Sequence, residues 1–143
     1  MPRPIFRRPS AKKSVSLMHR ADWDNPDANW LEEHIQAAII IHLRQTGAAF
    51  EVGMEGVRLS KAQRGRAKVQ GMDAGKADIK ILLEGGRTIH VELKRKGGRV
   101  SSEQSRWHDK IRSMGFEVHV VFASCPTDGV DQVRAIIEGC DQN

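Results

Sequence analysis

The sequence predicts an α/β fold in which a mixed sheet is flanked by helices, and three patterns predict it. Apolar residues recur at helical spacing between residues 27 and 46. Two runs, 77–83 and 87–95, alternate apolar and polar residues as strands do. A helix, a strand and a helix are then predicted over 101–115, 117–124 and 128–140. A strand followed by a helix and another strand favours a parallel crossover, which places helices over a mixed sheet.

The first helix has an Asp or Asn cap near Asp27 and a Gly stop signal at Gly47. Its apolar stripe consists of Leu31, Ile35, Ala38, Ile39 and Leu43. Because Ile39–Ile41 extends the apolar surface over more than half of the circumference, we expect this helix to be buried against the sheet. A short strand, "AFEVGM", follows, and then a polar connection over 57–75 with room for a turn or two of helix.

The two alternating runs form a predicted hairpin whose loop length decides which side chains share a face. A two-residue Gly85-Gly86 turn would place Asp78 opposite Leu93 and set polar residues against apolar ones. A three-residue loop over 84–86 places Asp78 opposite Glu92 and keeps the two faces consistent. We therefore predict the second register, with Lys80 opposite His90 and Ile81 opposite Ile89, and glycine supplying the left-handed position of the loop.

The composition indicates one domain of a cytoplasmic protein. The chain has 143 residues, no apolar run of the length that crosses a membrane, and two cysteines, Cys125 and Cys140, whose spacing favours reduced thiols over a disulfide scaffold or a zinc site. We assign residues 1–26, rich in proline and arginine, to a flexible basic arm and residues 27–143 to the folded domain.

Basic residues are concentrated in two segments that carry no acid. Residues 1–21 contain six Lys and Arg residues, and the second segment, 57–70, contains Arg58, Lys61, Arg64, Arg66 and Lys68. Clustered positive charge favours a polyanionic partner, because each neutralised phosphate releases condensed counterions. A solvated surface or a solubility tail is the alternative interpretation.

Asp78 and Glu92 would repel each other across the predicted hairpin, which makes sense if a hard cation lies between them. Mg²⁺ prefers oxygen ligands and is commonly held by one or two carboxylates together with water and phosphate. Lys94 lies on the same face and is placed to hold an attacking water or to stabilise charge on a phosphate. The alternative is an exposed sheet face with alternating charges, and the pattern alone does not separate the two.

The segment "ADIKILLEGGRTIHVELKRKGG" resembles the core of PD-(D/E)XK nucleases. Together with "SSEQSRW" and "MGFEVHVV" it resembles the VRR-NUC branch of that superfamily, over about residues 29–138. The resemblance implies a restriction-endonuclease-like αβββαβ core. One departure is Ala77, which precedes the aspartate where the motif has proline.

The resemblance also implies the roles of site residues. Asp78, Glu92 and the backbone carbonyl of Leu93 would be metal ligands, Lys94 the catalytic lysine, and Gln104 a residue near the active site. A glutamate of the first helix completes the acidic cluster. Glu32, four residues before Gln36, matches the family pattern, and Glu33 is the alternative.

Gln104 has a second interpretation. Ser101 to Gln104 is an S-x-x-Q capping box, in which the Gln104 side chain would bond the start of the helix. We expect that one rotamer cannot serve both the cap and the active site. Trp30 and Trp107 are predicted core residues rather than platforms for bases, and His90 is predicted to pack or to contact phosphate rather than to act in catalysis.

The resemblance implies a metal-dependent DNA endonuclease that uses Mg²⁺, with Mn²⁺ as a substitute and no small-molecule cofactor. Structure-selective cutting of branched DNA, similar to that of Holliday-junction resolvases, is expected from a homodimer in a bacterial or phage-infected cell. The alternatives are a non-catalytic DNA-binding protein, or a nuclease module active only within a larger phage or repair complex. The expected contacts to DNA are Arg58, Lys61, Arg64, Arg66, Lys68, Lys76, Arg95 and Lys96.

Overall fold

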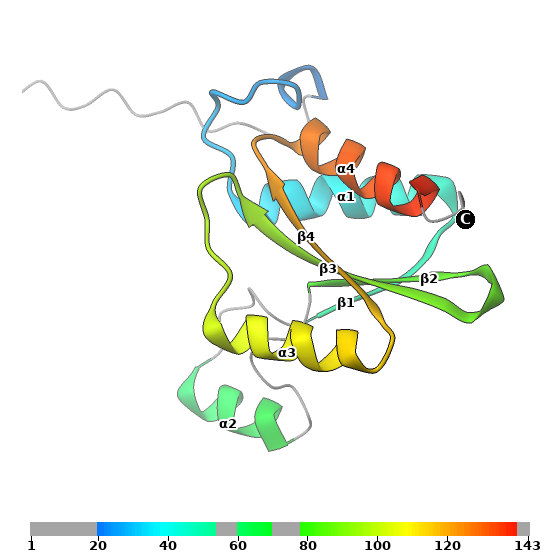
Figure 1. Cartoon of the computed structure of the whole chain (residues 1–143). Coiled ribbons are helices and arrows are strands. Elements are labelled where there is room, and N and C mark those ends of the chain that lie inside the picture. The colour runs from blue at the N-terminus through cyan, green and yellow to red at the C-terminus, as the bar shows by residue number, and fades with distance from the viewer. Residues whose placement is uncertain (1–19, 54–59, 70–77, 140–143) are drawn as a thin grey trace, which may run out of the picture.

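A computed structural model describes residues 20–53, 60–69 and 78–139 of the chain (Figure 1). Its elements are η1 (Arg20–Asp22), α1 (Glu32–Thr46), β1 (Ala49–Val52), α2 (Lys61–Val69), β2 (Ile79–Leu83), η2 (Glu84–Gly86), β3 (Arg87–Arg95), α3 (Ser102–Ser113), β4 (Glu117–Ala123) and α4 (Pro126–Gly139). The predicted αβββαβ order is confirmed, and the polar connection between β1 and β2 contains α2. No helix in these described ranges is long and apolar enough to cross a membrane.

The four strands form one mixed sheet in the order β1-β2-β3-β4. β1, β2 and β3 are antiparallel neighbours, whereas β4 runs parallel to β3. A parallel pair needs a crossover connection, and α3 supplies it. Figure 1 shows α1 and α4 on one face of the sheet and α3 on the other. The predicted mixed sheet with helices on both faces is therefore confirmed.

The hairpin of β2 and β3 has the predicted register. Lys80 lies opposite His90 and Ile81 opposite Ile89, and the three-residue segment η2 closes the turn. Gly85 and Gly86 take φ values of 79° and 78°, a region that only glycine enters without strain. Continuing the register by one residue beyond β2 sets Asp78 opposite Glu92, as the alternation required.

The main core lies between the sheet and the pair of helices α1 and α4. Ile35, Ile39 and Leu43 of α1 are completely buried and pack with strand residues such as Ile81 and Val91. Burying each of these side chains contributes about 1.5–3 kcal/mol relative to leaving it in water. Gly47 ends α1 in the predicted left-handed conformation, with a φ of 73°. This packing fixes α1 across the sheet, and with it the position of Glu32.

Two helix boundaries differ from the sequence prediction. α1 begins at Glu32 instead of near Asp27, because the residues before it fold differently: the indole N–H of Trp30 donates to the carbonyl of Asn25 at 2.8 Å, and Trp30 is 2% exposed. α4 begins at Pro126, two residues before the predicted start. Proline suits the first turn of a helix because its fixed φ matches and its missing N–H is not needed there.

The predicted arm is also shorter than residues 1–26. Trp23 belongs to the buried core, and its carbonyl accepts a hydrogen bond from the backbone of Thr127 at 3.2 Å. The guanidinium of Arg20 stacks on the Trp23 ring, 5.2 Å from its centroid. Residues 20–26 are thus part of the folded domain. The rest of the predicted arm, residues 1–19, lies outside the described residues.

Candidate active site

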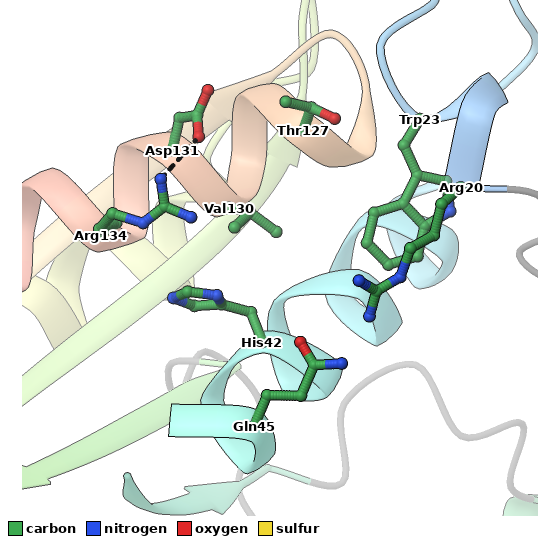
Figure 2. Close-up of a pocket in the computed structure, with 8 residues that line it drawn as sticks. All are labelled: Arg20, Trp23, His42, Gln45, Thr127, Val130, Asp131 and Arg134. Atoms are coloured by element: carbon green, nitrogen blue, oxygen red, sulfur yellow. Dashed lines mark hydrogen bonds and ion pairs between the residues drawn. The ribbon is translucent and has the colours of Figure 1, made fainter. Parts of the chain in front are cut away.

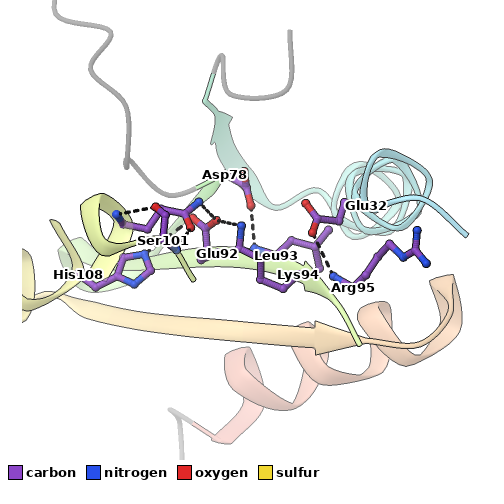
Figure 3. A network of polar contacts seen from close by, with 9 residues as sticks. Glu32, Asp78, Glu92, Leu93, Lys94, Arg95, Ser101 and His108 are labelled. Atoms are coloured by element: carbon purple, nitrogen blue, oxygen red, sulfur yellow. Dashed lines mark hydrogen bonds and ion pairs between the residues drawn. The ribbon is translucent and has the colours of Figure 1, made fainter. Parts of the chain in front are cut away.

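The C-terminal part of β3 runs past the end of β2. Pairing with β2 stops at Val91, while pairing with β4 continues to Arg95. Two carboxylates occupy the edge beyond β2 (Figure 3). Asp78 Oδ2 accepts a hydrogen bond from the Leu93 amide at 2.7 Å, and Glu32 Oε1 accepts one from the Arg95 amide at 3.3 Å. The structure therefore brings acids from α1 and from the start of β2 to successive outward amides of one strand.

Glu92 lies between these acids and α3, and its side chain points to the α3 face of the sheet. It is only 1% exposed, so its charge would be costly to bury without partners. Gln104 Nε2 donates to Glu92 Oε1 at 2.5 Å, and Lys94 Nζ lies 3.3 Å from the same oxygen. The other oxygen, Oε2, is 3.8 Å from His108 Nε2. Three side chains of different chemistry thus surround one carboxylate.

Gln104 makes the predicted capping bond and also contacts Glu92. Its Oε1 accepts from the Ser101 amide at 2.9 Å, while Ser101 Oγ accepts from the Gln104 amide at 3.1 Å, which completes the capping box. The same carboxamide donates to Glu92. The expectation that one rotamer could not make both contacts was wrong. The side-chain oxygen of Gln104 bonds the Ser101 amide, and its side-chain nitrogen bonds Glu92.

Lys94 shares a face with Glu92, two residues away, and its side chain is 13% exposed. Its ammonium is therefore mostly shielded from water, where its attraction to a negative group is stronger than at the surface. Of the two glutamates considered for the first helix, Glu32 contacts β3. Glu33 is exposed in the same first turn.

The donors of this site suit a hard cation by type. Glu32, Asp78 and Glu92 offer carboxylate oxygens, and the Leu93 carbonyl lies on the same side of the strand as the Leu93 amide that Asp78 contacts. Oxygen ligands of this kind are preferred by Mg²⁺ and Mn²⁺. Among the described residues, however, no group of three or more His, Cys, Asp or Glu side chains is arranged to hold a metal ion as it stands.

Sequence reasoning missed His108. The side chain is 2% exposed and lies against Glu92. The available signal was its spacing, because His108 follows Gln104 by four residues and side chains four apart share one face of a helix. Without the placement of α3 on β3, that spacing carries no information about Glu92.

His90 packs, as the sequence suggested. Its ring meets Phe116 edge to face, with centroids 5.7 Å apart. Burial, followed by the charges of Lys80 and His108, lowers the pKa of His90 below its ordinary value of 6.5. Of the two tryptophans expected in the core, Trp30 is buried there, and Trp107 of α3 is partly buried.

The described residues predicted to bind DNA are all exposed. Lys61, Arg64 and Arg66 belong to α2, which has its own capping box between Ser60 and Gln63. Of the other two, Arg95 ends β3 and its amide contacts Glu32, and Lys96 follows it. The remaining predicted contacts, Arg58, Lys76 and the side chain of Lys68, lie outside the described residues.

A cavity of about 240 Å³ lies between η1, α1 and α4 (Figure 2). It is lined by residues that include Arg20, Trp23, His42 and Arg134, and none of the carboxylate residues described above lines it. Its volume is below the roughly 300 Å³ at which small-molecule sites begin. The carboxylates around β3 therefore form a site separate from this cavity.

Comparison with known proteins agrees with this arrangement. The model of the VRR-NUC domain family matches residues 31–124, a range that contains Glu32, Asp78, Glu92, Lys94 and Gln104. A solved structure described as a VRR_NUC domain is similar in fold, with a TM-score of 0.51 and 22% sequence identity, and the match covers 75% of this chain and 94% of that chain. A search of curated proteins found no match.

Proposed function

The chain belongs to the VRR-NUC domain family, a family of nucleases, and from this premise we propose that it is a metal-dependent DNA endonuclease. The observation that supports the proposal best is the convergence of Glu32, Asp78 and Glu92 on four residues of β3, with the Lys94 ammonium among them. The acids come from three separate parts of the chain. Bringing three like charges together costs free energy, and binding a cation for phosphodiester hydrolysis would give the cluster a function.

Electrostatics support the requirement for a cation. Glu32, Asp78 and Glu92 bring three carboxylates to this part of β3, and the Lys94 ammonium lies beside Glu92. A phosphodiester also carries a negative charge and would be repelled from such a site. The ligands we assign to a divalent ion are Asp78, Glu92, Glu32 and the Leu93 carbonyl. Bound there, Mg²⁺ or Mn²⁺ would screen the negative charge of the phosphate and lower the pKa of a bound water.

The protein groups have separate tasks in this proposal. Lys94 orients the attacking water or stabilises charge that develops on the phosphate, because its ammonium is shielded and held beside Glu92. Arg95 and Lys96, exposed at and just after the end of β3, bind backbone phosphates. The basic helix α2 binds further phosphates, which positions DNA without reading its sequence. We accordingly propose selectivity for DNA structure, with branched DNA as the substrate and a homodimer as the acting form.

A second candidate is a nuclease module that cuts only within a larger complex. It is favoured by one observation: Asp78 and Glu32 already accept hydrogen bonds from the backbone of β3. In this candidate, a partner or DNA rearranges these acids into the geometry that binds metal. A purified chain that cleaves four-way junctions without added protein would exclude this candidate.

The decisive experiment compares the wild type with Asp78→Ala and Lys94→Ala on duplex, flap, single-stranded and four-way-junction DNA in Mg²⁺, Mn²⁺ or EDTA. We expect cleavage by the wild type with either metal, none in EDTA, and a reduction of about 10²-fold or more in each variant. Glu32→Ala and Glu33→Ala form a matched pair, since only Glu32 contacts β3. Cleavage that survives both Asp78→Ala and Lys94→Ala would remove the assignment.

A further inference from the structure

We propose that His108 is a positioning residue that, together with Gln104, fixes the orientation of the Glu92 carboxylate and so sets the affinity of the site for a divalent ion. The inference rests on the proposed function, because it concerns the same site. It adds a residue of α3 to which neither the sequence motif nor the family match gives a role.

The geometry places α3 on both oxygens of Glu92. His108 Nε2 is 3.8 Å from Oε2, and Gln104 Nε2 is 2.5 Å from Oε1. The two α3 residues are one helical turn apart, so a single helix faces both oxygens of the carboxylate. With Lys94 at 3.3 Å from Oε1, rotation of the carboxylate would break at least one of these interactions.

The chemistry of His108 fits this role better than that of a core filler. α3 also buries the apolar side chain of Ile111, and an apolar side chain at position 108 would be buried at no desolvation cost. A 2% exposed imidazole costs free energy unless a polar partner compensates it. Glu92, 1% exposed, is the polar group that faces it: its Oε2 lies 3.8 Å from His108 Nε2, within ion-pair range and longer than a hydrogen bond. The position beside Glu92 is therefore what distinguishes this buried imidazole from an apolar core residue.

The consequence concerns metal affinity. Groups that orient a ligating carboxylate typically change metal affinity or activity by about 10–100-fold when they are removed. In His108→Leu the Glu92 carboxylate retains Gln104 and Lys94 but no longer has the imidazole at Oε2. We expect the variant to bind Mn²⁺ at least about 10-fold more weakly than the wild type.

Two conservative variants separate positioning from simple folding effects. The side-chain nitrogen of His108→Gln reaches the position of Nε2, whereas that of His108→Asn is too short to do so. We expect the Gln variant to retain most of the Mn²⁺ affinity and the Asn variant to lose it. Ile111→Ala, one turn further along α3 and equally buried, should lower the melting temperature and leave Mn²⁺ affinity unchanged.

The experiment is a calorimetric titration of the full chain with Mn²⁺ in the absence of DNA, alongside thermal unfolding in EDTA. Leu and Asn variants that bind Mn²⁺ as the wild type does would overturn the inference and leave the proposed function standing. A wild type that binds no Mn²⁺ would overturn the proposed function and the inference with it. If His108→Leu does not fold, the comparison of His108→Gln with His108→Asn decides alone, and equal affinity of these two overturns the inference.

Discussion

Gln104 donates a 2.5 Å hydrogen bond to Glu92 while its carbonyl oxygen caps the start of α3 at Ser101. One carboxamide therefore joins the geometry of a helix terminus to that of a buried carboxylate. A shift of α3 along the sheet would disturb the bond to Glu92, whereas the bond to Ser101 would move with the helix. The two functions of Gln104 are nevertheless separable by substitution, because each depends on a different atom.

Ser101→Ala and Gln104→Glu test this separation. Ser101→Ala removes the Ser101 Oγ half of the capping box and leaves both bonds of the Gln104 carboxamide, and we expect it to lower the free energy of unfolding by about 1 kcal/mol with unchanged cleavage by folded protein. Gln104→Glu keeps an acceptor for the Ser101 amide but sets a second carboxylate against buried Glu92. We expect it to lower the free energy of unfolding by on the order of 3 kcal/mol and to abolish cleavage. Urea unfolding and junction cleavage measure both, and equal effects of the two substitutions would contradict the separation.

The basic helix α2 should contribute to the salt dependence of DNA binding. Arg64→Ala and Arg66→Ala each remove an exposed guanidinium. For each phosphate of duplex DNA that is no longer neutralised, the slope of log affinity against log salt should become shallower by about 0.9. Arg44→Ala is a matched control, exposed on α1 on the other face of the sheet. The slopes are measured by binding titrations between about 50 and 200 mM salt. Equal slopes for Arg64→Ala, Arg66→Ala and Arg44→Ala would refute the role of α2.

Close packing between α1 and α4 depends on Gly129. A Cβ at this position would lie 2.6 Å from Ile35 Cγ2, a distance at which atoms must move. We therefore expect Gly129→Ala to destabilise the fold by about 1–3 kcal/mol. Gly139→Ala in the same helix meets nothing within 4 Å and should leave the free energy of unfolding nearly unchanged. Chemical denaturation of both variants provides the measurement, and a Gly129→Ala variant as stable as Gly139→Ala would contradict the packing.

Asp128 gives a prediction for pH. Burial by itself would raise the pKa of Asp128, but hydrogen bonds from the Ser124 amide, Gln132 and the Ser124 hydroxyl outweigh it and lower that pKa below 3.8. Because the folded pKa is the lower one, the ionised carboxylate stabilises the fold fully above pH 3.8 and this effect disappears as pH falls through the folded pKa.

The variant Asp128→Asn isolates that effect. At neutral pH we expect it to be less stable than the wild type by about 1 kcal/mol, since its amide cannot replace the hydrogen bonds to a charged group. The difference between the two proteins should shrink as the pH is lowered below 3.8. Urea unfolding of both proteins at neutral pH and at acid pH gives the two differences. A difference that grows on acidification would show that the sign is wrong.

Local patterns in the sequence determined the elements and the register of the hairpin. The alternation over 77–83 and 87–95 separates polar from apolar faces, and only a three-residue loop keeps these faces consistent. The position of Asp78 opposite Glu92 follows from this register of the two neighbouring strands. The start of α1 was less predictable, since the Trp30 bond to Asn25 replaces helix with an irregular turn before Glu32.

Tertiary structure alone decided what surrounds Glu92. The sequence shows that Gln104 and His108 share a face of α3, and helical periodicity can go no further, because it sets the direction of a side chain relative to its own helix only. Whether that face meets β3 depends on the crossover that seats α3 on the sheet, and so on packing between residues distant in the chain. The capping bond of Gln104 is local and could be predicted from the sequence. Its bond to Glu92 and the position of His108 depend on how α3 packs against β3.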